Sequence, residues 1–450
     1  MNDQLAGKRY VVVGLGKSGL GAIELLHRRG ATVLALDENP KASVPFVGVE
    51  VAVGFPNEYW RGAEAVVVSP GVPMSKPELQ AARLAGVPVF GEIELTWRFM
   101  PKGAGPILAI TGTNGKSTTT SLLGELMMQQ WPNTFVGGNL GTAFSSAYAD
   151  PARKPYDFHV IELSSFQLEG IDTAQFHGAA ILNLSPDHLD RYRSHGAYGA
   201  AKALIFRTQP RDGFAVVNLD DNEVLTLAKA AHVPLYGFTR SGVRSNPSFA
   251  GFAMGDGRRF VLSFGEFAPF DLNNRALRGA HNLDNAMAAA LMAAKAGISH
   301  AAIQAGLDSF PGLPHRLELV RSLDGVEWVN DSKATNVDSS LVAMHAFDGA
   351  LWLIAGGKGK GAPYAPLVEA AKGKVRGVLT IGADAAAIAR AFEASTEVIA
   401  CETLQAAVAK ARAVAKAGDT VLLSPACASY DQFTNFEHRG DAFKTLVRAL

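Results

Sequence analysis

Residues 109–120, AITGTNGKSTTT, combine residue types and spacing that suit phosphate binding. They lie between an apolar run and an amphipathic one, so we expect a strand, a turn and a helix. In such a loop backbone N–H groups cradle phosphates, Lys116 contacts the terminal phosphates and the Ser117 hydroxyl binds magnesium. Ile110 stands where the general pattern has its first glycine, so a glycine-rich turn that only caps a helix is the alternative. The Gly-Lys-Ser-Thr run favours a nucleoside triphosphate.

A second glycine pattern lies in RYVVVGLGKSGLGAIELL, residues 9–26. Gly14, Gly16 and Gly19 follow an apolar run, and Asp37 closes the next apolar run. This arrangement is typical of a dinucleotide-binding turn, in which the glycines approach a diphosphate and the acid contacts ribose hydroxyls. A nicotinamide-dependent oxidoreductase is therefore one hypothesis.

Two further segments place polar side chains at the ends of predicted strands in the middle of the chain. Glu162 ends the apolar run of DFHVIELSSF, where it is a candidate for binding the magnesium of a bound nucleotide. His188 lies in NLSPDHLDRY and could be a metal ligand or an acid–base group. An exposed histidine beside a helix-capping Asp187 is the equally open alternative.

The last third of the chain repeats this arrangement. Asp331, Lys333 and Thr335 follow a predicted strand in VNDSKATN, which suits the binding of phosphate or carboxylate. Lys358 and Lys360 lie in the glycine-rich segment AGGKGKGA after the next strand. That segment is either an anion site or a basic surface loop.

Three stretches of alternating strands and helices must position these residues. We predict an α/β protein of three domains: a Rossmann-like domain at 1–102, a P-loop domain at 103–311 and a second Rossmann-like domain at 312–450. Pro/Gly-rich linkers at 100–106 and 309–316 mark the boundaries. A polar, Gly-rich region around 240–275 interrupts the middle stretch.

Composition narrows the class of protein. Lys plus Arg equals Asp plus Glu, 42 each among 450 residues, which argues against nucleic acid as a partner. Cys401 and Cys427 are the only cysteines, so a disulfide framework is excluded. We see no signal segment and no apolar run long enough to insert in a membrane, so we expect a cytoplasmic enzyme. We also expect a monomer.

Several segments together resemble the ATP-dependent Mur ligases of peptidoglycan synthesis, and most closely the branch that adds D-glutamate. These segments are TGTNGKST, ELSSFQLE, NLSPDHLDRY, AHNLDNAMAA, FPGLPHRLE, NDSKATN, GGKGKG and LLSPACASYDQFTNFEHRGDAF. The resemblance implies that ATP phosphorylates the carboxylate of UDP-MurNAc-L-alanine to an acyl phosphate, which the amino group of D-glutamate then attacks. The diphosphate at the first glycine motif would be that of the UDP-sugar.

The resemblance also implies a role for each residue at a matching position. Catalysis would depend on Lys116, His188, Lys202 and Asn139, with Asn139 near the reacting carboxylate. Two Mg²⁺ ions would be held by Ser117, Glu162, His188 and a carbamylated Lys202, for which an ordinary surface lysine is the alternative. ATP would contact the loop Thr111, Gly112, Thr113, Asn114, Gly115, Lys116, Ser117 and Thr118, together with Asn282, Arg316, Asp331 and Lys333.

The two other substrates would bind at opposite ends of the chain. The UDP-sugar would contact Gly16, Lys17, Ser18, Asp37, Ser69, Pro70 and Gly71. D-glutamate would contact Thr335, Lys360, Ser429 and Phe436.

Three other classes remain as alternatives. An oxidoreductase would use only the first 40 residues, and a P-loop switch would not need the third domain. A folylpolyglutamate synthetase would share the ATP domain but would not be expected to carry the amino-terminal glycine motif. If the ligase hypothesis holds, we expect the third domain to move about residues 309–316 when ligands bind.

Overall fold

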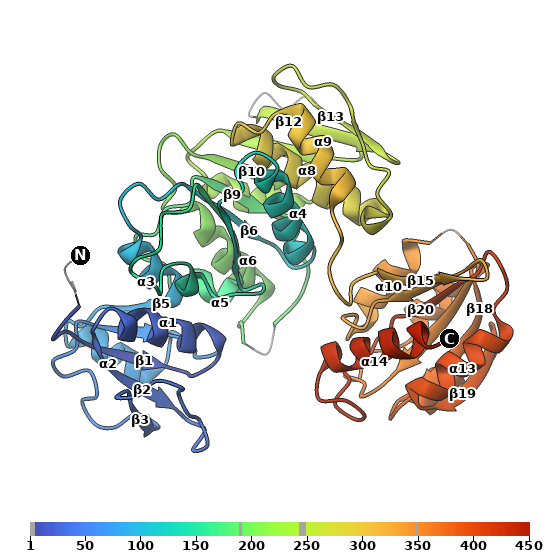
Figure 1. The fold of residues 1–450 in the computed structure, drawn as a ribbon, viewed down its shortest axis with the longest axis horizontal. Coiled ribbons are helices and arrows are strands. Elements are labelled where there is room, and N and C mark those ends of the chain that lie inside the picture. The colour runs from blue at the N-terminus through green and yellow to red at the C-terminus, as the bar shows by residue number, and fades with distance from the viewer. Residues whose placement is uncertain (1–4, 189–190, 243–248, 348) are drawn as a thin grey trace. The chain divides into compact units, whose positions relative to one another are not determined.

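The computed structural model describes residues 5–188, 191–242, 249–347 and 349–450. The chain forms three β-sheets, each flanked by helices, which confirms the predicted three-domain α/β architecture (Figure 1). Compactness divides the chain into two units. Unit 1 comprises Met1–Leu272 and Asp284–Asp308, and unit 2 comprises Asn273–Leu283 and Ser309–Leu450. The predicted domain boundaries at 102/103 and 311/312 stay predictions.

The first sheet has the order β3-β2-β1-β4-β5, and all its pairs are parallel as predicted. Alternate residues of β1 enter different cores: Val12 packs with α1 and α3, whereas Val11 and Val13 pack with α2. The strands are β1 (Arg9–Val13), β2 (Thr32–Asp37), β3 (Glu50–Val53), β4 (Ala65–Val68) and β5 (Val89–Gly91). The helices are α1 (Lys17–Arg28), α2 (Pro77–Leu84) and α3 (Glu92–Phe99).

The second sheet has the order β14-β13-β12-β11-β10-β9-β6-β8-β7 and also belongs to unit 1. Its strands are β6 (Ile107–Thr111), β7 (Thr134–Gly138), β8 (Phe158–Glu162), β9 (Gly178–Ile181), β10 (Phe214–Asn218), β11 (Leu235–Thr239), β12 (Phe249–Asp256), β13 (Arg259–Leu262) and β14 (Phe270–Asp271). Its helices are α4 (Lys116–Met128), α5 (Ser165–Leu168), α6 (His195–Ala203), α7 (Asn222–Leu227), α8 (Ala280–Lys295) and α9 (His300–Ser309).

The region around 240–275, described from the sequence only as polar and Gly-rich, contains strands that the sequence patterns did not predict. Its described part contains β12, β13 and β14, which pair antiparallel and extend the sheet at one edge. Alternate residues of β12 are buried and exposed, the pattern of a strand with one solvated face. Sequence patterns also missed β7, which pairs in parallel with β8.

The third sheet has the order β15-β16-β20-β17-β18-β19 and lies in unit 2. The sequence analysis missed its edge strand β15, which pairs antiparallel with β16. Its strands are β15 (Glu318–Leu323), β16 (Val326–Asn330), β17 (Leu351–Gly356), β18 (Val375–Ile381), β19 (Glu397–Glu402) and β20 (Thr420–Leu423). Its helices are α10 (Val337–His345), α11 (Ala365–Ala371), α12 (Ala385–Phe392), α13 (Leu404–Val414) and α14 (Phe436–Arg448).

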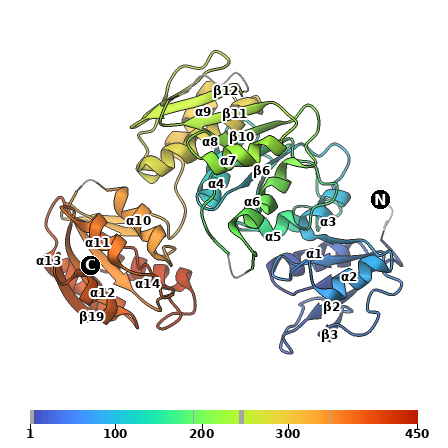
Figure 2. The ribbon, with the colours of Figure 1, turned by 180° about the vertical axis from the view of Figure 1, so that it is seen from behind.

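Two helical layers cover this third sheet. The layer of α10, α11 and α12 shares a core with Leu351, Leu353 and Ala355 of β17. The layer of α13 and α14 packs on the opposite face, against Trp352 and Ile354 (Figure 2). Because both faces are covered, β17 is buried along its whole length.

Candidate functional site

The predicted phosphate loop joins β6 to α4. Gly115 has a left-handed backbone (φ 82°), and a Cβ there would collide with the side-chain oxygen of Asn285, so this position accepts only glycine. The Lys116 ammonium folds back over the loop, with Nζ 3.0 Å from the carbonyl oxygen of Gly112 and 2.8 Å from that of Thr113. α4 begins at Lys116, so its N-terminal N–H groups face the loop.

Asn183, which follows β9, fastens this loop and was missed by the sequence analysis. Its side-chain oxygen accepts hydrogen bonds from the backbone N–H groups of Thr113 (3.1 Å) and Asn114 (2.8 Å). Its side-chain nitrogen donates to the carbonyl of Asn114 (3.0 Å). The signal was its position at the C-terminal end of a buried parallel strand, where ligand sites form.

Lys202, in α6, is buried beside the same loop and is therefore not a surface lysine. Its Nζ donates to the carbonyl of Gly112 at 2.8 Å and lies 4.6 Å from the centre of the Tyr198 ring. Burial, with the neighbouring charge of Lys116 acting in the same direction, lowers the pKa of Lys202 to about 7. The Gly112 carbonyl thus accepts from two lysines.

Glu162 ends β8, and its carboxylate has one oxygen free for a further ligand. Oε1 accepts a hydrogen bond of 2.6 Å from the amide of Asn139, which brings these two predicted residues together. Oε2 is buried and has no hydrogen-bond partner among the described residues, and the same holds for Oγ1 of Thr118. Such buried oxygens suit a hard cation or its bound water.

His188 follows β9, and its ring packs edge-on against Phe166 (4.9 Å between ring centres). Its side chain is 46% exposed, and its Nε2 lies 3.6 Å from a carboxylate oxygen of Asp187. In the described part of the chain, no three His, Cys, Asp or Glu side chains form a metal cluster. Mg²⁺ needs no such cluster, because it keeps several waters and binds through one or two carboxylates plus phosphates.

The amino-terminal glycine motif leads into α1, where Gly16 is the N-cap and Lys17 and Ser18 open the helix. Asp37 stabilises this turn: its Oδ2 accepts from the backbone N–H of Leu15 at 2.7 Å. The Ser69–Gly71 turn is held by Arg191, whose guanidinium donates to the carbonyls of Pro70 (3.0 Å) and Gly71 (3.2 Å). The sequence analysis missed Arg191, although it lies in the DHLDRY motif.

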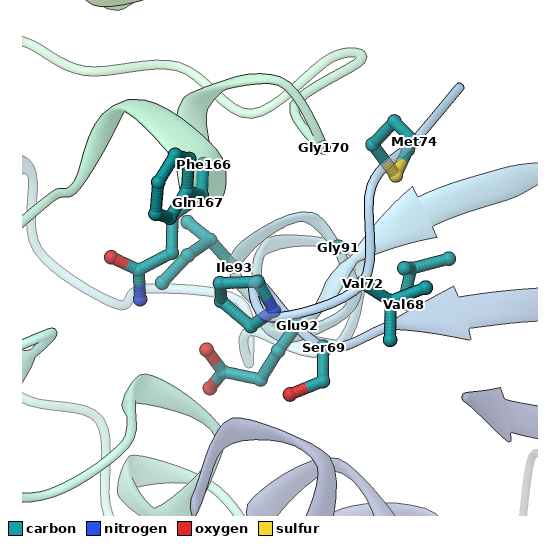
Figure 3. Close-up of a pocket in the computed structure, with 11 residues that line it drawn as sticks. Val68, Ser69, Val72, Met74, Gly91, Glu92, Ile93, Phe166, Gln167 and Gly170 are labelled. Atoms are coloured by element: carbon teal, nitrogen blue, oxygen red, sulfur yellow. The ribbon is translucent and has the colours of Figure 1, made fainter. Parts of the chain in front are cut away.

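A cavity of about 10 Å³ lies under that turn, between Ser69, Glu92 and Gln167 (Figure 3). The Glu92 carboxylate is fully buried: one oxygen accepts from the backbone N–H of Ser145, and the other has no partner in the described residues. Burial raises the pKa of Glu92 to about 7. This buried acid was not predicted.

In unit 2, Asp331 is buried where β16 ends. Its carboxylate accepts from the Ser424 hydroxyl (2.8 Å) and from the backbone N–H of Leu317 (3.2 Å), and burial raises its pKa to about 7. Arg316 is half-buried, with no hydrogen-bond partner for its Nε among the described residues. It lines a cavity of about 100 Å³ with Arg275 and Arg278.

The other predicted residues of unit 2 lie on neighbouring elements. Asn282 is buried and donates to the carbonyl of Arg278 at 2.9 Å. Lys333 Nζ lies 5.8 Å from the ring centre of Phe436, the first residue of α14. Ser429 is buried, Thr335 is half-buried and Lys360 is exposed.

Comparisons with known proteins agree over the whole chain. Three family models match: "Mur ligase MurD-like, N-terminal domain" at residues 8–91, "Mur ligase middle domain" at 110–293 and "Mur ligase, glutamate ligase domain" at 315–427. A UDP-N-acetylmuramoylalanine–D-glutamate ligase of Myxococcus xanthus is 58% identical over 461 residues, covering 100% of both chains. That of Anaeromyxobacter dehalogenans is 48% identical over 99% of this chain and 98% of its own.

Solved structures share the fold. The UDP-N-acetylmuramate-alanine ligase of Thermotoga maritima matches with a TM-score of 0.61 at 17% identity, covering 98% of this chain and 99% of that one. A pseudomurein peptide ligase of Methanothermus fervidus matches with a TM-score of 0.60 at 20% identity, covering 98% of this chain and 100% of that one.

Proposed function

Since this chain belongs to the Mur ligase family, we propose that it joins D-glutamate to UDP-N-acetylmuramoyl-L-alanine at the expense of ATP. The observation that carries the proposal is the 58% identity, over both full chains, with a relative named for that reaction. The geometry of unit 1 supports it, because a built phosphate loop and a buried, half-satisfied glutamate lie at the ends of neighbouring strands, β6 and β8.

The proposed reaction has two steps, phosphorylation of a carboxylate and formation of an amide. A carboxylate oxygen of the UDP-substrate attacks the γ-phosphorus of ATP, releasing ADP and leaving an acyl phosphate. The D-glutamate nitrogen then attacks the acyl carbon, loses a proton and expels inorganic phosphate as the amide forms. Lys116 offsets the charge on the transferring phosphoryl group, and Asn139, already fixed to Glu162, orients the reacting carboxylate.

The buried Glu162 oxygen suits Mg²⁺. Glu162 and Ser117 would hold the ion through oxygen and His188 through a ring nitrogen, and bound Mg²⁺ would neutralise charge on the phosphates. A carbamate on Lys202 would add a further oxygen ligand. It would also change the Lys202 side chain from a cation beside Lys116 to an anion. Carbamylation joins the neutral amine to CO₂ and releases one proton, and the lowered pKa of Lys202 supplies that neutral amine near pH 7.

The remaining roles are proposed as the family pattern assigns them. The UDP moiety would bind Gly16, Lys17, Ser18 and the Ser69–Gly71 turn, while Thr335, Lys360, Ser429 and Phe436 would bind D-glutamate. Asp37 and Asp331 would contribute mainly by holding the backbone of their sites in place, because their carboxylates accept hydrogen bonds from the backbone N–H groups of Leu15 and Leu317. No helix in the described residues could span a membrane; we propose a cytoplasmic monomer.

The test is phosphate release from ATP by the purified full chain. We expect release only when UDP-MurNAc-L-alanine and D-glutamate are both present, because the amine can attack only an activated carboxylate. Equal turnover with L-glutamate or meso-diaminopimelate would contradict the proposal, and release with ATP alone would favour a P-loop switch. Lys116→Ala should abolish release, whereas Lys229→Ala, an exposed lysine of the same unit, should leave it unchanged.

A further inference from the structure

Three loops of unit 2 meet at the C-terminal edge of its sheet, after β17, β18 and β20. At Gly356 a Cβ would collide with the carbonyl of Ile381, and at Gly357 with the carbonyl of Ala428, so only glycine allows these backbones to approach. Lys358 and Ala428 then exchange two backbone hydrogen bonds, of 2.8 and 3.0 Å. The start of the glycine loop 356–361 is thereby fixed to the segment that bears Ser429.

The tip of this loop is fixed by Asp384, the N-cap residue of α12. The Asp384 backbone N–H donates to the carbonyl of Gly357 at 2.9 Å. The Asp384 carboxylate lies directly against Gly359, where a Cβ would collide with its Oδ2. The same oxygen accepts a hydrogen bond of 2.7 Å from the hydroxyl of Tyr364, just beyond the loop. One aspartate thus contacts the loop at Gly357 and Gly359 and binds Tyr364 just after it.

A second aspartate holds Asp384 itself in position. The Asp431 carboxylate accepts from the backbone N–H of Ala383 at 2.9 Å, and it leaves no room for a Cβ at Gly382. Residues 382–384 are therefore clamped between the loop after β17 and the loop after β20. Burial and the neighbouring Asp384 carboxylate raise the pKa of Tyr364, so its hydroxyl stays protonated and keeps donating.

We propose that Asp384, supported by Tyr364, is the positioning residue that sets the conformation of the loop carrying Lys360, and through it the affinity for D-glutamate. The proposal rests on the proposed function, which includes Lys360 among the residues that bind D-glutamate, a dicarboxylate whose negative charge a lysine ammonium would offset. Lys360 is exposed and its flanking glycines are permissive, so without this contact the ammonium would sample many positions.

The main experiment compares Asp384→Ala, Tyr364→Phe and Gly359→Ala in the full chain. Each should raise the KM for D-glutamate, by about tenfold or more for Asp384→Ala and Gly359→Ala. The KM values for ATP and the UDP-substrate should stay within about twofold, because their proposed residues lie on other elements. Tyr364→Phe removes one hydroxyl and keeps the ring, so it tests the contact without emptying the core.

Two controls distinguish a change in the position of the loop from general disruption of the protein. In the Asp384→Ala/Tyr364→Phe double variant, adding Gly359→Ala should raise the KM for D-glutamate by less than about a further twofold. The new Cβ at residue 359 then has space, because the groups that it would meet are gone. Glu369→Gln, which alters an exposed carboxylate on α11, should change no KM. Equal rises in all three KM values, or an unchanged D-glutamate KM, would overturn the inference.

Amide hydrogen exchange keeps the inference testable if the wild-type protein does not use D-glutamate. Exchange at residues 357–361 should be faster in Asp384→Ala than in the wild type, with Glu369→Gln unchanged. An absence of turnover with D-glutamate would then refute the proposed function alone, whereas unchanged exchange would refute the role of Asp384.

Discussion

The carbonyl of Gly112 accepts from the ammonium groups of both Lys116 and Lys202, although these residues lie on different helices. The two ammonium groups repel each other, and this repulsion acts with the burial of Lys202 to lower its pKa. A nucleotide bound at the loop would offset this charge, and so would a carbamate. At the residue scale, the site is therefore arranged for anions.

For Lys202 we expect a pH-dependent requirement for bicarbonate. After incubation at low pH to remove a carbamate, the rate of reactivation at constant dissolved CO₂ should rise with pH up to about 7, as the neutral amine increases, and level off above it. Reactivation is measured from phosphate release after bicarbonate is added. Lys202→Ala should be inactive and partly rescued by short-chain carboxylates; full unaided activity would refute the carbamate.

For Glu92 we expect stability to fall as pH rises. Its folded pKa of about 7 lies above the ordinary 4.5, so the folded state binds more protons between these values and the unfolding free energy decreases across that window. Glu92→Gln removes the charge and keeps an acceptor for Ser145, so it should be more stable than the wild type at pH 8, by up to about 3 kcal/mol. Urea unfolding at pH 5 and pH 8 measures this. Identical pH dependence in both proteins would contradict it, and Glu64→Gln is the exposed control.

At the scale of elements, α3 links the first sheet to the second through one carboxylate. Glu94 is fully buried and accepts from the backbone N–H groups of Asp172 (3.0 Å), Thr173 (2.9 Å) and Ala174 (2.8 Å). Arg98, one turn later, donates to it at 2.8 Å. Despite burial, these hydrogen bonds hold the pKa of Glu94 below its ordinary value.

Glu94→Ala should lower the unfolding free energy by about 3–5 kcal/mol, because it leaves three backbone N–H groups and the Nε of Arg98 without their acceptor. Since the folded pKa is depressed, the stabilisation should be present above about pH 4.5 and lost as pH falls through the folded pKa. Urea unfolding of unit 1 over this range checks both points. Glu50→Ala, at an exposed edge-strand position, should have little effect, and an equally small effect of Glu94→Ala would contradict the argument.

At the scale of the whole molecule, the proposed ATP contacts are divided between the units: the phosphate loop lies in unit 1, and Asn282 and Arg316 lie in unit 2. One unit boundary falls at Asp308–Ser309, beside the predicted linker 309–316. A ligand that contacts both units restricts their relative motion.

We therefore expect saturating nucleotide plus UDP-substrate to change the radius of gyration measured by X-ray scattering. Lys116→Ala should reduce this response, because it weakens the phosphate contact in unit 1, whereas Lys229→Ala should not. An unchanged radius in the wild type would count against closure about residues 309–316.

The sequence alone determined the features that contiguous residues specify. The glycine motifs predicted both strand–turn–helix junctions, because tight turns and helix starts depend on local backbone freedom. Apolar runs alternating with amphipathic segments predicted the three α/β domains. Local patterns missed β7, β15 and the antiparallel β12–β14, since these strands are defined by pairing with partners elsewhere in the sheets.

Only the tertiary structure decided which distant groups share a site. Lys202 is 90 positions from Gly112, and Glu94 is about 80 from the N–H groups that it accepts from, so no spacing rule links them. Nor does the sequence say that Asp384 lies against Gly359, which follows from three strand ends meeting at one edge of a sheet. The same packing decides which side chains are buried. It therefore also decides the shifted pKa values of Lys202, Glu92 and Asp331, because desolvation depends on what surrounds a charge.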